Sequence, residues 1–339
     1  MAPMTRSQSP NGVPPPAVAD YYKRRAAGGV RLIVSEGVVI ERPSAKNDPQ
    51  VPHMFGQAAL DGWHRVVAQV HEAGGRIAPQ LWHVGPRIDP LGTPWVPPGP
   101  VDTASGLRDW RTPRLAPMTE EAIADTITAF AQGAANAVRQ GFDCIEIHGH
   151  LIDDFFWKMS NTRTDRWGGQ ALRDRARFGA SVAAAVRAQM PPDMSLIFRL
   201  SQWKGLDFDA RVAETPAEMT EWLEPLAAAG VDVFHCSQRR YWEPAFAGSD
   251  LNLAGWAKKL TGKVSITVGS VGLSGEFIGG GTSAPASLDQ LIRRLDREEF
   301  DLVAVGRALL ADPLWVEKVR TGRWDKMQTY DRAMRAKLS

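Results

Sequence analysis

The sequence predicts a (β/α)8 barrel, the fold known as a TIM barrel, and three observations lead to this fold class. Short β-branched runs alternate with longer amphipathic segments along most of the 339 residues, which is typical of parallel α/β proteins. Eight such runs are present, the number of strands in this barrel. Nearly every run ends in polar residues or glycine, as expected where strands deliver functional groups at the carboxyl-terminal face of a barrel.

The elements follow from the period and from the residues that end each run. Strands are predicted over 1–5 (a stub), 31–40, 76–83, 144–149, 194–203, 231–238, 263–271 and 301–307. Helices are predicted over 57–73, 119–140, 171–189 and 215–229. Thr119 precedes two glutamates, and Thr215 opens a capping box that ends at Glu218, so both residues are expected to cap helices. The alternative is a doubly wound open sheet, which should show a glycine-rich fingerprint after its first strand, and none is present.

Composition excludes several classes of protein. A hydrophobic fraction of 44% and a charged fraction of 23% are typical of a soluble globular chain, here expected to form one domain over 1–339. Lys and Arg number 40 and Asp and Glu 38, so charge suggests neither nucleic acid nor an anionic membrane as partner. Two cysteines in predicted strands offer no disulfide framework. Without a signal peptide or an apolar span, the expected location is the cytoplasm.

One connection of the predicted barrel is unusually long. Residues 84–118 contain many prolines and glycines and little helical period. Long ordered loops in compact domains usually serve a functional site. The segment is therefore predicted to be a lid, or an excursion of the chain, over the barrel mouth.

The ends of the last two predicted strands resemble a phosphate site. Gly269 and Ser270 end one strand, and Gly306 and Arg307 end the next. Glycine lets backbone N–H groups approach a ligand, and barrels commonly bind phosphate after strands seven and eight. The alternative is that the glycines only make tight turns.

Gln80 and Arg199 are expected near the ends of two further strands. A buried arginine in a barrel mouth needs an acceptor, because an unpaired buried charge is costly. Either Arg199 forms a salt bridge with Glu36 or Glu146, or it faces an electron-rich ring or an anion held over the barrel.

The segment 144–169 is the one around which the chain is organised. His148 and His150 lie two positions apart and would point to the same side of an extended chain. As donors they could orient a carbonyl or nitro oxygen; as acceptors they could bind zinc together with a residue such as His83, His235 or Asp153. An isolated His-x-His pair is a weak metal signal, and no metal site is predicted.

The chain contains an ordered set of motifs: MAPMTR (1–6), SEG (35–37), QLWH (80–83), IEIHG (145–149), SNTRTDRWGG (160–169), RLS (199–201), VGS (268–270) and VGR (305–307). In order and spacing these motifs resemble the Old Yellow Enzyme family of FMN-dependent NAD(P)H:flavin oxidoreductases. The resemblance runs over nearly the whole chain. It implies a (β/α)8 barrel with non-covalent FMN at its mouth, NAD(P)H as reductant, and a small-molecule enone or nitroalkene as substrate; a homo-oligomer is left open.

The resemblance also implies a role for each motif residue. Pro3, Met4 and Thr5 would lie along the flavin ring, Gly37 and Gln80 would contact it, and Arg199 would face its N1/O2 side. The phosphate would be held by Gly269, Ser270, Gly306 and Arg307. His148 and His150 would hydrogen-bond the carbonyl or nitro oxygen of the substrate while hydride passes from the flavin to its β-carbon.

The sequence departs from the family pattern in two places. Relatives with this kind of loop read HGAHGYLID, whereas the chain reads HGHLID at 148–153 and lacks the tyrosine that typically donates the proton. The first strand is also expected to be truncated, because MAPMTR stands at residue 1. Two flavin-dependent functions therefore stay open: alkene reduction, or a flavin-binding barrel with impaired alkene reduction that acts as an NAD(P)H oxidase or a ligand-binding protein. A barrel hydrolase that takes a phosphate ligand or depends on a metal is the third hypothesis.

Overall fold

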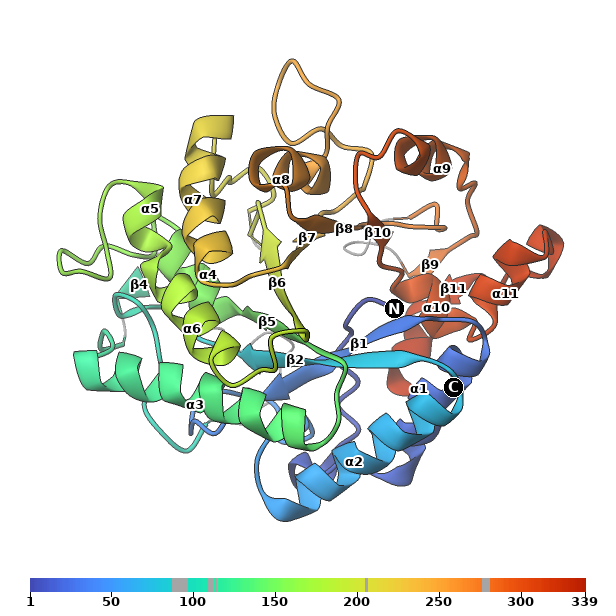
Figure 1. The fold of residues 1–339 in the computed structure, drawn as a ribbon, viewed down its shortest axis with the longest axis horizontal. Coiled ribbons are helices and arrows are strands. Elements are labelled where there is room, and N and C mark those ends of the chain that lie inside the picture. The colour runs from blue at the N-terminus through green and yellow to red at the C-terminus, as the bar shows by residue number, and fades with distance from the viewer. Residues whose placement is uncertain (87–96, 109–111, 114, 205–206, 276–280) are drawn as a thin grey trace.

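The computed structural model describes residues 1–86, 97–108, 112–113, 115–204, 207–275 and 281–339. In this part of the chain seven parallel strands form one curled sheet, which Figure 1 shows from one end with helices around it. The strands, in their order across the sheet, are β1 (Leu32–Val39), β2 (Arg76–His83), β5 (Cys144–Gly149), β6 (Ser195–Ser201), β7 (Val233–Ser237), β8 (Val264–Val268) and β10 (Leu302–Val303).

The N-terminal residues complete the ring between the last strand and the first. The amide of Ala2 donates to the carbonyl of Val305 at 2.9 Å, and the amide of Val34 donates to the carbonyl of Met1 at 3.1 Å. The prediction of a strand over 1–5 is nevertheless wrong, since none is formed there. Pro3 has no N–H to continue the ladder, and the chain goes on along the cavity described below.

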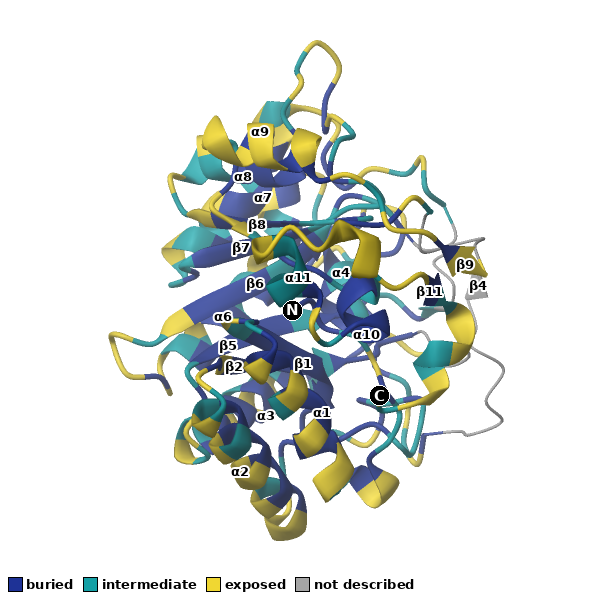
Figure 2. Cartoon of the chain, turned by 90° about the vertical axis from the view of Figure 1, so that its right-hand side faces the viewer, coloured by how far each residue is buried: buried dark blue, intermediate teal, exposed yellow. Residues whose placement is uncertain are grey.

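Helices cover the outside of the sheet (Figure 1), and Figure 2 shows their exposed residues on the outer faces and mostly buried residues in the strands. The helices of the outer ring are α1 (Pro16–Ala27), α2 (Gln57–Glu72), α3 (Glu120–Arg139), α6 (Arg177–Arg187), α7 (Pro216–Ala228), α8 (Leu253–Thr261) and α9 (Asp289–Asp296). The predicted caps are confirmed: Thr119 accepts from the amide of Ala122 and Thr215 from that of Glu218, each at 3.2 Å.

Shorter elements fill the connections. They are α4 (His150–Phe156), α5 (Leu172–Arg175), α10 (Arg307–Ala311), α11 (Trp315–Arg320), β3 (Leu107–Arg108), β4 (Thr112–Pro113), β9 (Thr282–Ser283), β11 (Tyr330–Asp331) and three 3-10 turns, Pro10–Gly12, Trp324–Lys326 and Arg332–Ala336. Among the described residues, none of the helices has both the length and the apolar content needed to traverse a lipid bilayer.

Three more predicted elements differ from the structure. The strand predicted over 263–271 ends at Val268 in β8, so Gly269 and Ser270 lie in the following loop. The helix predicted over 171–189 is two helices, α5 and α6, because it is interrupted at Ala176, where ψ is −13°. The strand predicted over 301–307 is reduced to the two residues of β10. Gly306, with φ −102° and ψ −97°, turns the chain, so that Arg307 begins α10 instead of ending a strand.

The interior of the barrel is built in two layers. The lower layer is apolar and consists of Ala2, Val34, Ala78, Cys144, Ile197, Val233, Ile266 and Ala304. Side chains two positions further along a strand point to the same side. In four strands these positions are Gln80, Glu146, Arg199 and His235. A polar layer therefore lies between the apolar layer and the carboxyl-terminal face.

The described part of the long connection 84–118 is anchored to the barrel by buried carboxylates. Asp102 accepts from Arg42 at 2.8 Å and from Ser44 and His83 at 2.9 Å each. Asp154 of α4 accepts from the amide of Ala104 at 2.8 Å. Residues 87–96, 109–111 and 114 lie outside the described residues, so the predicted lid stays a prediction.

Candidate active site

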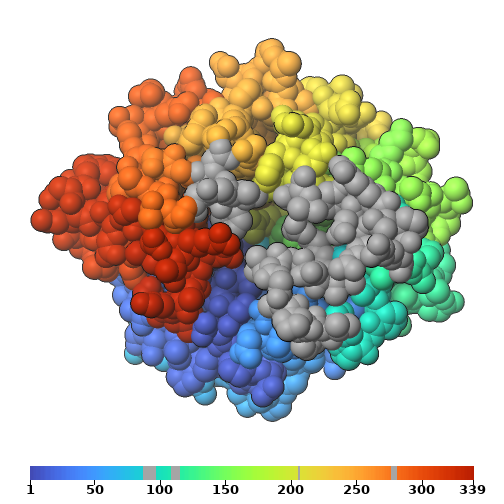
Figure 3. Space-filling view, turned by 180° about the vertical axis from the view of Figure 1, so that it is seen from behind, coloured from blue at the N-terminus to red at the C-terminus, as the bar shows by residue number. Residues whose placement is uncertain are grey.

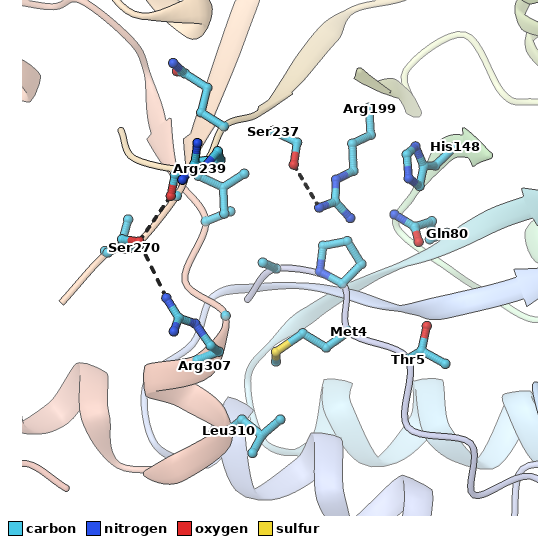
Figure 4. A pocket seen from close by; sticks show the side chains of 18 of the residues that line it. Met4, Thr5, Gln80, His148, Arg199, Ser237, Arg239, Ser270, Arg307 and Leu310 are labelled. Atoms are coloured by element: carbon cyan, nitrogen blue, oxygen red, sulfur yellow. Dashed lines mark hydrogen bonds between the residues drawn. The ribbon is translucent and has the colours of Figure 1, made fainter. Parts of the chain in front are cut away.

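A cavity of about 390 Å³ opens at the carboxyl-terminal ends of the strands. The close-up in Figure 4 shows its two ends, with Gln80, His148 and Arg199 on one side and Ser270 and Arg307 on the other. Met4 and Thr5 lie along the lower side of this view. No Asp or Glu lines the cavity among the described residues, whereas five arginines do: Arg6, Arg199, Arg239, Arg307 and Arg335.

One end of the cavity is formed by side chains of β2, β5, β6 and the start of α4. His148 ends the inward face of β5 and His150 begins α4, and their ring centroids are 6.0 Å apart. The Trp82 ring lies edge-on to His150 at 6.5 Å. Arg199 donates from Nη2 to the hydroxyl of Ser237 at 3.2 Å. These groups present hydrogen-bond donors and an aromatic wall to one space.

Electrostatics set the protonation of these groups. Burial, and then the positive charge of Arg199, lower the pKa of His148 to about 3, so its ring is neutral at physiological pH. Burial also lowers the pKa of Arg199, and the nearby charge of Glu146 acts in the opposite direction. The guanidinium stays protonated because its ordinary pKa is so high. The sequence prediction left open a salt bridge of Arg199 to Glu36 or Glu146. Among the described residues neither salt bridge is formed, and Arg199 donates to Ser237 instead.

The other end of the cavity is formed by the loop after β8 and the start of α10. Ser270 adopts a left-handed conformation, with φ 50°. A Cβ at Gly269, where φ is 145°, would meet the carbonyl oxygen of Gln238 at 2.6 Å, so only glycine fits. Arg307 donates from Nη2 to the carbonyl of Gly275 at 2.7 Å and to Ser270 Oγ at 3.5 Å. A guanidinium, a hydroxyl and tightly turned backbone therefore meet here.

The N-terminal segment that lines the cavity is hydrogen-bonded to β1. Glu36 of β1 accepts from the amides of Arg6 at 2.8 Å and Ser7 at 3.3 Å. The side chain of Arg6 in turn donates to the carbonyl of Lys337 at 2.5 Å. Figure 3 shows the C-terminal segment in red beside the N-terminal residues in blue on this face of the molecule.

The structure brings nearly all of the predicted site residues to this one cavity. Its lining includes Pro3, Met4, Thr5, Gln80, His148, His150, Arg199, Gly269, Ser270, Gly306 and Arg307. Gly37 does not line it. Instead, Gly37 pairs with Gln80 across β1 and β2, and a Cβ there would lie 3.1 Å from the Trp82 ring. Its role is therefore to leave room for an aromatic side chain of the wall.

Several lining residues were not predicted. Tyr330 and Arg335 come from the C-terminal segment, and Arg239 follows β7. Tyr330 belongs to a two-residue strand paired with β9, and Arg335 to a 3-10 turn, so no period in the sequence marks either residue. The sequence left open whether Trp82, Trp203 and Trp242, near strand ends, form a pocket wall or ordinary packing. Trp82 and Trp203 line the cavity, whereas Trp242 packs against Tyr241 with ring centroids 4.9 Å apart.

The zinc alternative finds no support in the described part of the chain, where no group of three or more potential ligands can hold a metal ion. His83 donates from Nε2 to Asp102 and accepts from the amide of Gly85 at Nδ1, each at 2.9 Å. His235 is bonded to Glu146 at 2.6 Å. Both histidines are thus engaged away from His148 and His150.

The residues present fit FMN. Arg199 Nε is a buried polar atom that has no hydrogen-bond partner among the described residues. Arg199 lines the cavity, so a polar ring there could accept a hydrogen bond from this donor. At the other end, Arg307 and Ser270 offer the donors that a phosphate needs. A parallel barrel with such a cavity at its carboxyl-terminal face has the features of a barrel flavoprotein.

Comparison with known proteins identifies the family. The sequence profile of the NADH:flavin oxidoreductase / NADH oxidase family matches residues 1–326. The chain is 31% identical to 12-oxophytodienoate reductase 7 of Oryza sativa subsp. japonica, over 94% of this chain and 83% of that protein. It is 30% identical to an NADPH dehydrogenase of Halalkalibacterium halodurans, over 92% of this chain and 86% of that protein.

The fold is also similar to that of a solved structure. Morphinone reductase is similar with a TM-score of 0.77 and 27% identity, over 99% of this chain and 88% of that protein. The chain belongs to the NADH:flavin oxidoreductase / NADH oxidase family, that is, the Old Yellow Enzyme family. It is therefore a (β/α)8 flavin oxidoreductase with FMN as cofactor and NADH or NADPH as reductant.

Proposed function

We propose that this enzyme reduces the C=C bond of α,β-unsaturated carbonyl or nitro compounds with hydride taken from NAD(P)H. The observation that carries the proposal is the arrangement of His148 and His150, whose rings lie 6.0 Å apart on the wall of the cavity that also holds Arg199. Two donors on one side of a bound ring are suited to polarise a carbonyl or nitro oxygen.

In this proposal the cavity residues hold FMN at both ends. FMN held by these residues would supply the redox chemistry, that is, hydride transfer between NAD(P)H and the substrate. Pro3, Met4, Thr5 and Gln80 would contact its ring, and Arg199 would lie near the electron-rich edge of the ring. Gly37, which does not line the cavity, would support this end through the room it leaves for Trp82. Gly269, Ser270, Gly306 and Arg307 would hold the phosphate.

The histidines are assigned to the substrate. His148 is neutral, because burial and Arg199 hold its pKa near 3, so it donates a hydrogen bond but transfers no proton at physiological pH. His150 is half-buried at the start of α4, where its side chain lies 3.9 Å from that of Asp153. The proton for the α-carbon of the substrate then comes from solvent at the cavity mouth.

A second candidate function is NAD(P)H oxidation with impaired alkene reduction, and the positions of the tyrosines favour it. Among the described residues Tyr330 alone of the tyrosines lines the cavity. It lies at the phosphate end, with the guanidinium carbon of Arg307 5.5 Å from its ring centroid. Tyr241 is buried against Trp242 and does not line the cavity. No tyrosine hydroxyl therefore stands beside the histidines to act as a general acid.

The visible absorption spectrum of the purified protein, before and after anaerobic NADH or NADPH, tests the proposal. A flavin band that bleaches with reductant, and recovers on addition of an enone or a nitroalkene, is the expected result. A band that recovers with oxygen and not with any alkene would select the second function. A colourless protein that does not take up FMN would refute the assigned cofactor residues.

A loop variant separates the two functions further. Replacing His150 by Ala-His-Gly-Tyr restores the length and the tyrosine of the related loops. If the missing acid limits the enzyme, alkene turnover rises while the flavin content stays the same. The same insertion with phenylalanine instead of tyrosine is the matched control, since it restores length without a hydroxyl.

The remaining assignments are part of the same proposal. A small molecule is the partner, and the described part of segment 84–118 is held against the barrel at Asp102 and Asp154. The two cysteines are free and buried, and burial raises the pKa of Cys144 to about 12. Such inert thiols are compatible with the reducing cytoplasm.

A further inference from the structure

The polar layer of the barrel interior contains a carboxylate for which the proposed function gives no role. Glu146 of β5 and His235 of β7 are both 0% exposed. Glu146 Oε1 accepts from Nε2 of Gln80, and Glu146 Oε2 from Nδ1 of His235, each at 2.6 Å. Strand register places Gln80 opposite Glu146 and Arg199 opposite His235, so the four side chains lie on neighbouring strands.

Hydrogen-bond chemistry fixes the orientation of this layer. An ionised carboxylate only accepts, so the amide of Gln80 must turn its NH₂ toward Glu146. This leaves Gln80 Oε1 as the acceptor available to a ligand in the cavity that Gln80 lines. The same reasoning puts the proton of His235 on Nδ1 and leaves Nε2 unprotonated, buried and without a partner among the described residues.

The charges of the layer follow from burial and contacts. Burial lowers the pKa of His235, so its ring is neutral. Burial acts to raise the pKa of Glu146, but the interactions with His235, Arg199 and Gln80 outweigh it and hold the pKa below its ordinary value. The layer thus contains one negative charge, on Glu146, and one positive charge, on Arg199, directly beneath the cavity.

We propose that Glu146, itself held by His235, is a positioning residue of the flavin site. It directs the oxygen of Gln80 toward the bound ring and offsets the charge of Arg199. The inference rests on the proposed function, because it takes Gln80 and Arg199 as flavin contacts. Without Glu146, Arg199 is uncompensated and favours the reduced flavin, which carries the additional negative charge.

The test is the two-electron reduction potential of the FMN-loaded enzyme. Glu146→Gln keeps the shape and removes the charge, and is expected to shift the ratio of reduced to oxidised flavin about tenfold toward the reduced form, about 30 mV upward. Asp143→Asn is the matched control. Asp143 directly precedes β5, three residues before Glu146, and accepts from His71 at 2.8 Å and Arg76 at 3.0 Å. Its loss should lower stability and leave the potential unchanged.

A second variant separates the charge of Glu146 from its effect on the orientation of Gln80. It also tests the proposal if Glu146→Gln does not fold. Glu146→Asp keeps the charge but is one methylene too short to reach Gln80 and His235 at 2.6 Å. The FMN dissociation constant should rise about tenfold, as for one lost charged hydrogen bond, with the potential near that of the wild type.

An unchanged potential in Glu146→Gln, or an unchanged FMN affinity in Glu146→Asp, would overturn the inference. A wild-type protein that binds no FMN would refute the proposed function instead. The two failures are therefore distinguishable.

Discussion

Replacing His148 tests whether this residue works as a neutral hydrogen-bond donor. Its pKa of about 3 lies well below pH 6, so the ring is almost entirely neutral there. The ring can thus stabilise charge developing on a substrate oxygen only through its neutral N–H. Removing one such positioned donor costs about 10²- to 10³-fold in rate, or roughly 3–4 kcal/mol. His148→Ala is expected to lose this amount, and His148→Asn, which keeps an N–H donor, about tenfold.

The assay is the oxidation of pre-reduced enzyme by an enone under anaerobic stopped-flow conditions, from pH 5 to 9. The pH profiles of the wild type and of His148→Asn should have the same shape, since a group with a pKa near 3 does not titrate in this range. His64→Asn, on the exposed face of α2, is the control and should behave as wild type. A limb with an apparent pKa between 6 and 7 that vanishes in both His148 variants would refute the reasoning, because it would make His148 a proton donor.

Three further predictions concern the cofactor site and its support. Arg307→Ala should raise the FMN dissociation constant about 10- to 100-fold, as for one lost charge-assisted hydrogen bond. Binding of riboflavin, which has no phosphate, should stay unchanged when both ligands are measured by fluorescence titration. An equal loss of affinity for both ligands would contradict a phosphate contact. Gly37→Ala places a Cβ 3.1 Å from the Trp82 ring and should cost about 1–3 kcal/mol in urea unfolding, whereas Gly281→Ala, with open space around it, should cost little. Burial raises the pKa of Glu36 to about 7, so the folded wild type loses stability as its carboxyl group ionises between pH 4.5 and 7. Glu36→Gln cannot ionise, so its free energy of unfolding should rise relative to that of the wild type by up to about 3 kcal/mol between pH 4.5 and 8. A constant difference in the free energy of unfolding across this range would be evidence against the raised pKa.

The central strands could be predicted from sequence because each is an apolar run with a sharp polar end. β2 and β5 occupy the predicted residues 76–83 and 144–149. The last strand could not be delimited in this way, because the apolar run continues through Ala304 and Val305 while the pairing that defines β10 ends at Val303. The C-terminal wall of the cavity could not be predicted from sequence for another reason. β11 is two residues long and pairs with β9 across the chain, so neither period nor length could mark it.

The polar layer shows which part of a barrel site sequence reasoning can and cannot reach. Period two alone places Glu146 on the same side of its strand as His148, and therefore inside the barrel. The partner of Glu146 could not be inferred, because His235 lies 89 residues further along the chain and comes into contact through the register of three neighbouring strands. A buried carboxylate one inward position below His148 is costly unless it is bonded on both oxygens. That both bonds are made, one of them to a predicted flavin contact, is the reason to expect that the charge is kept for the flavin and not for stability.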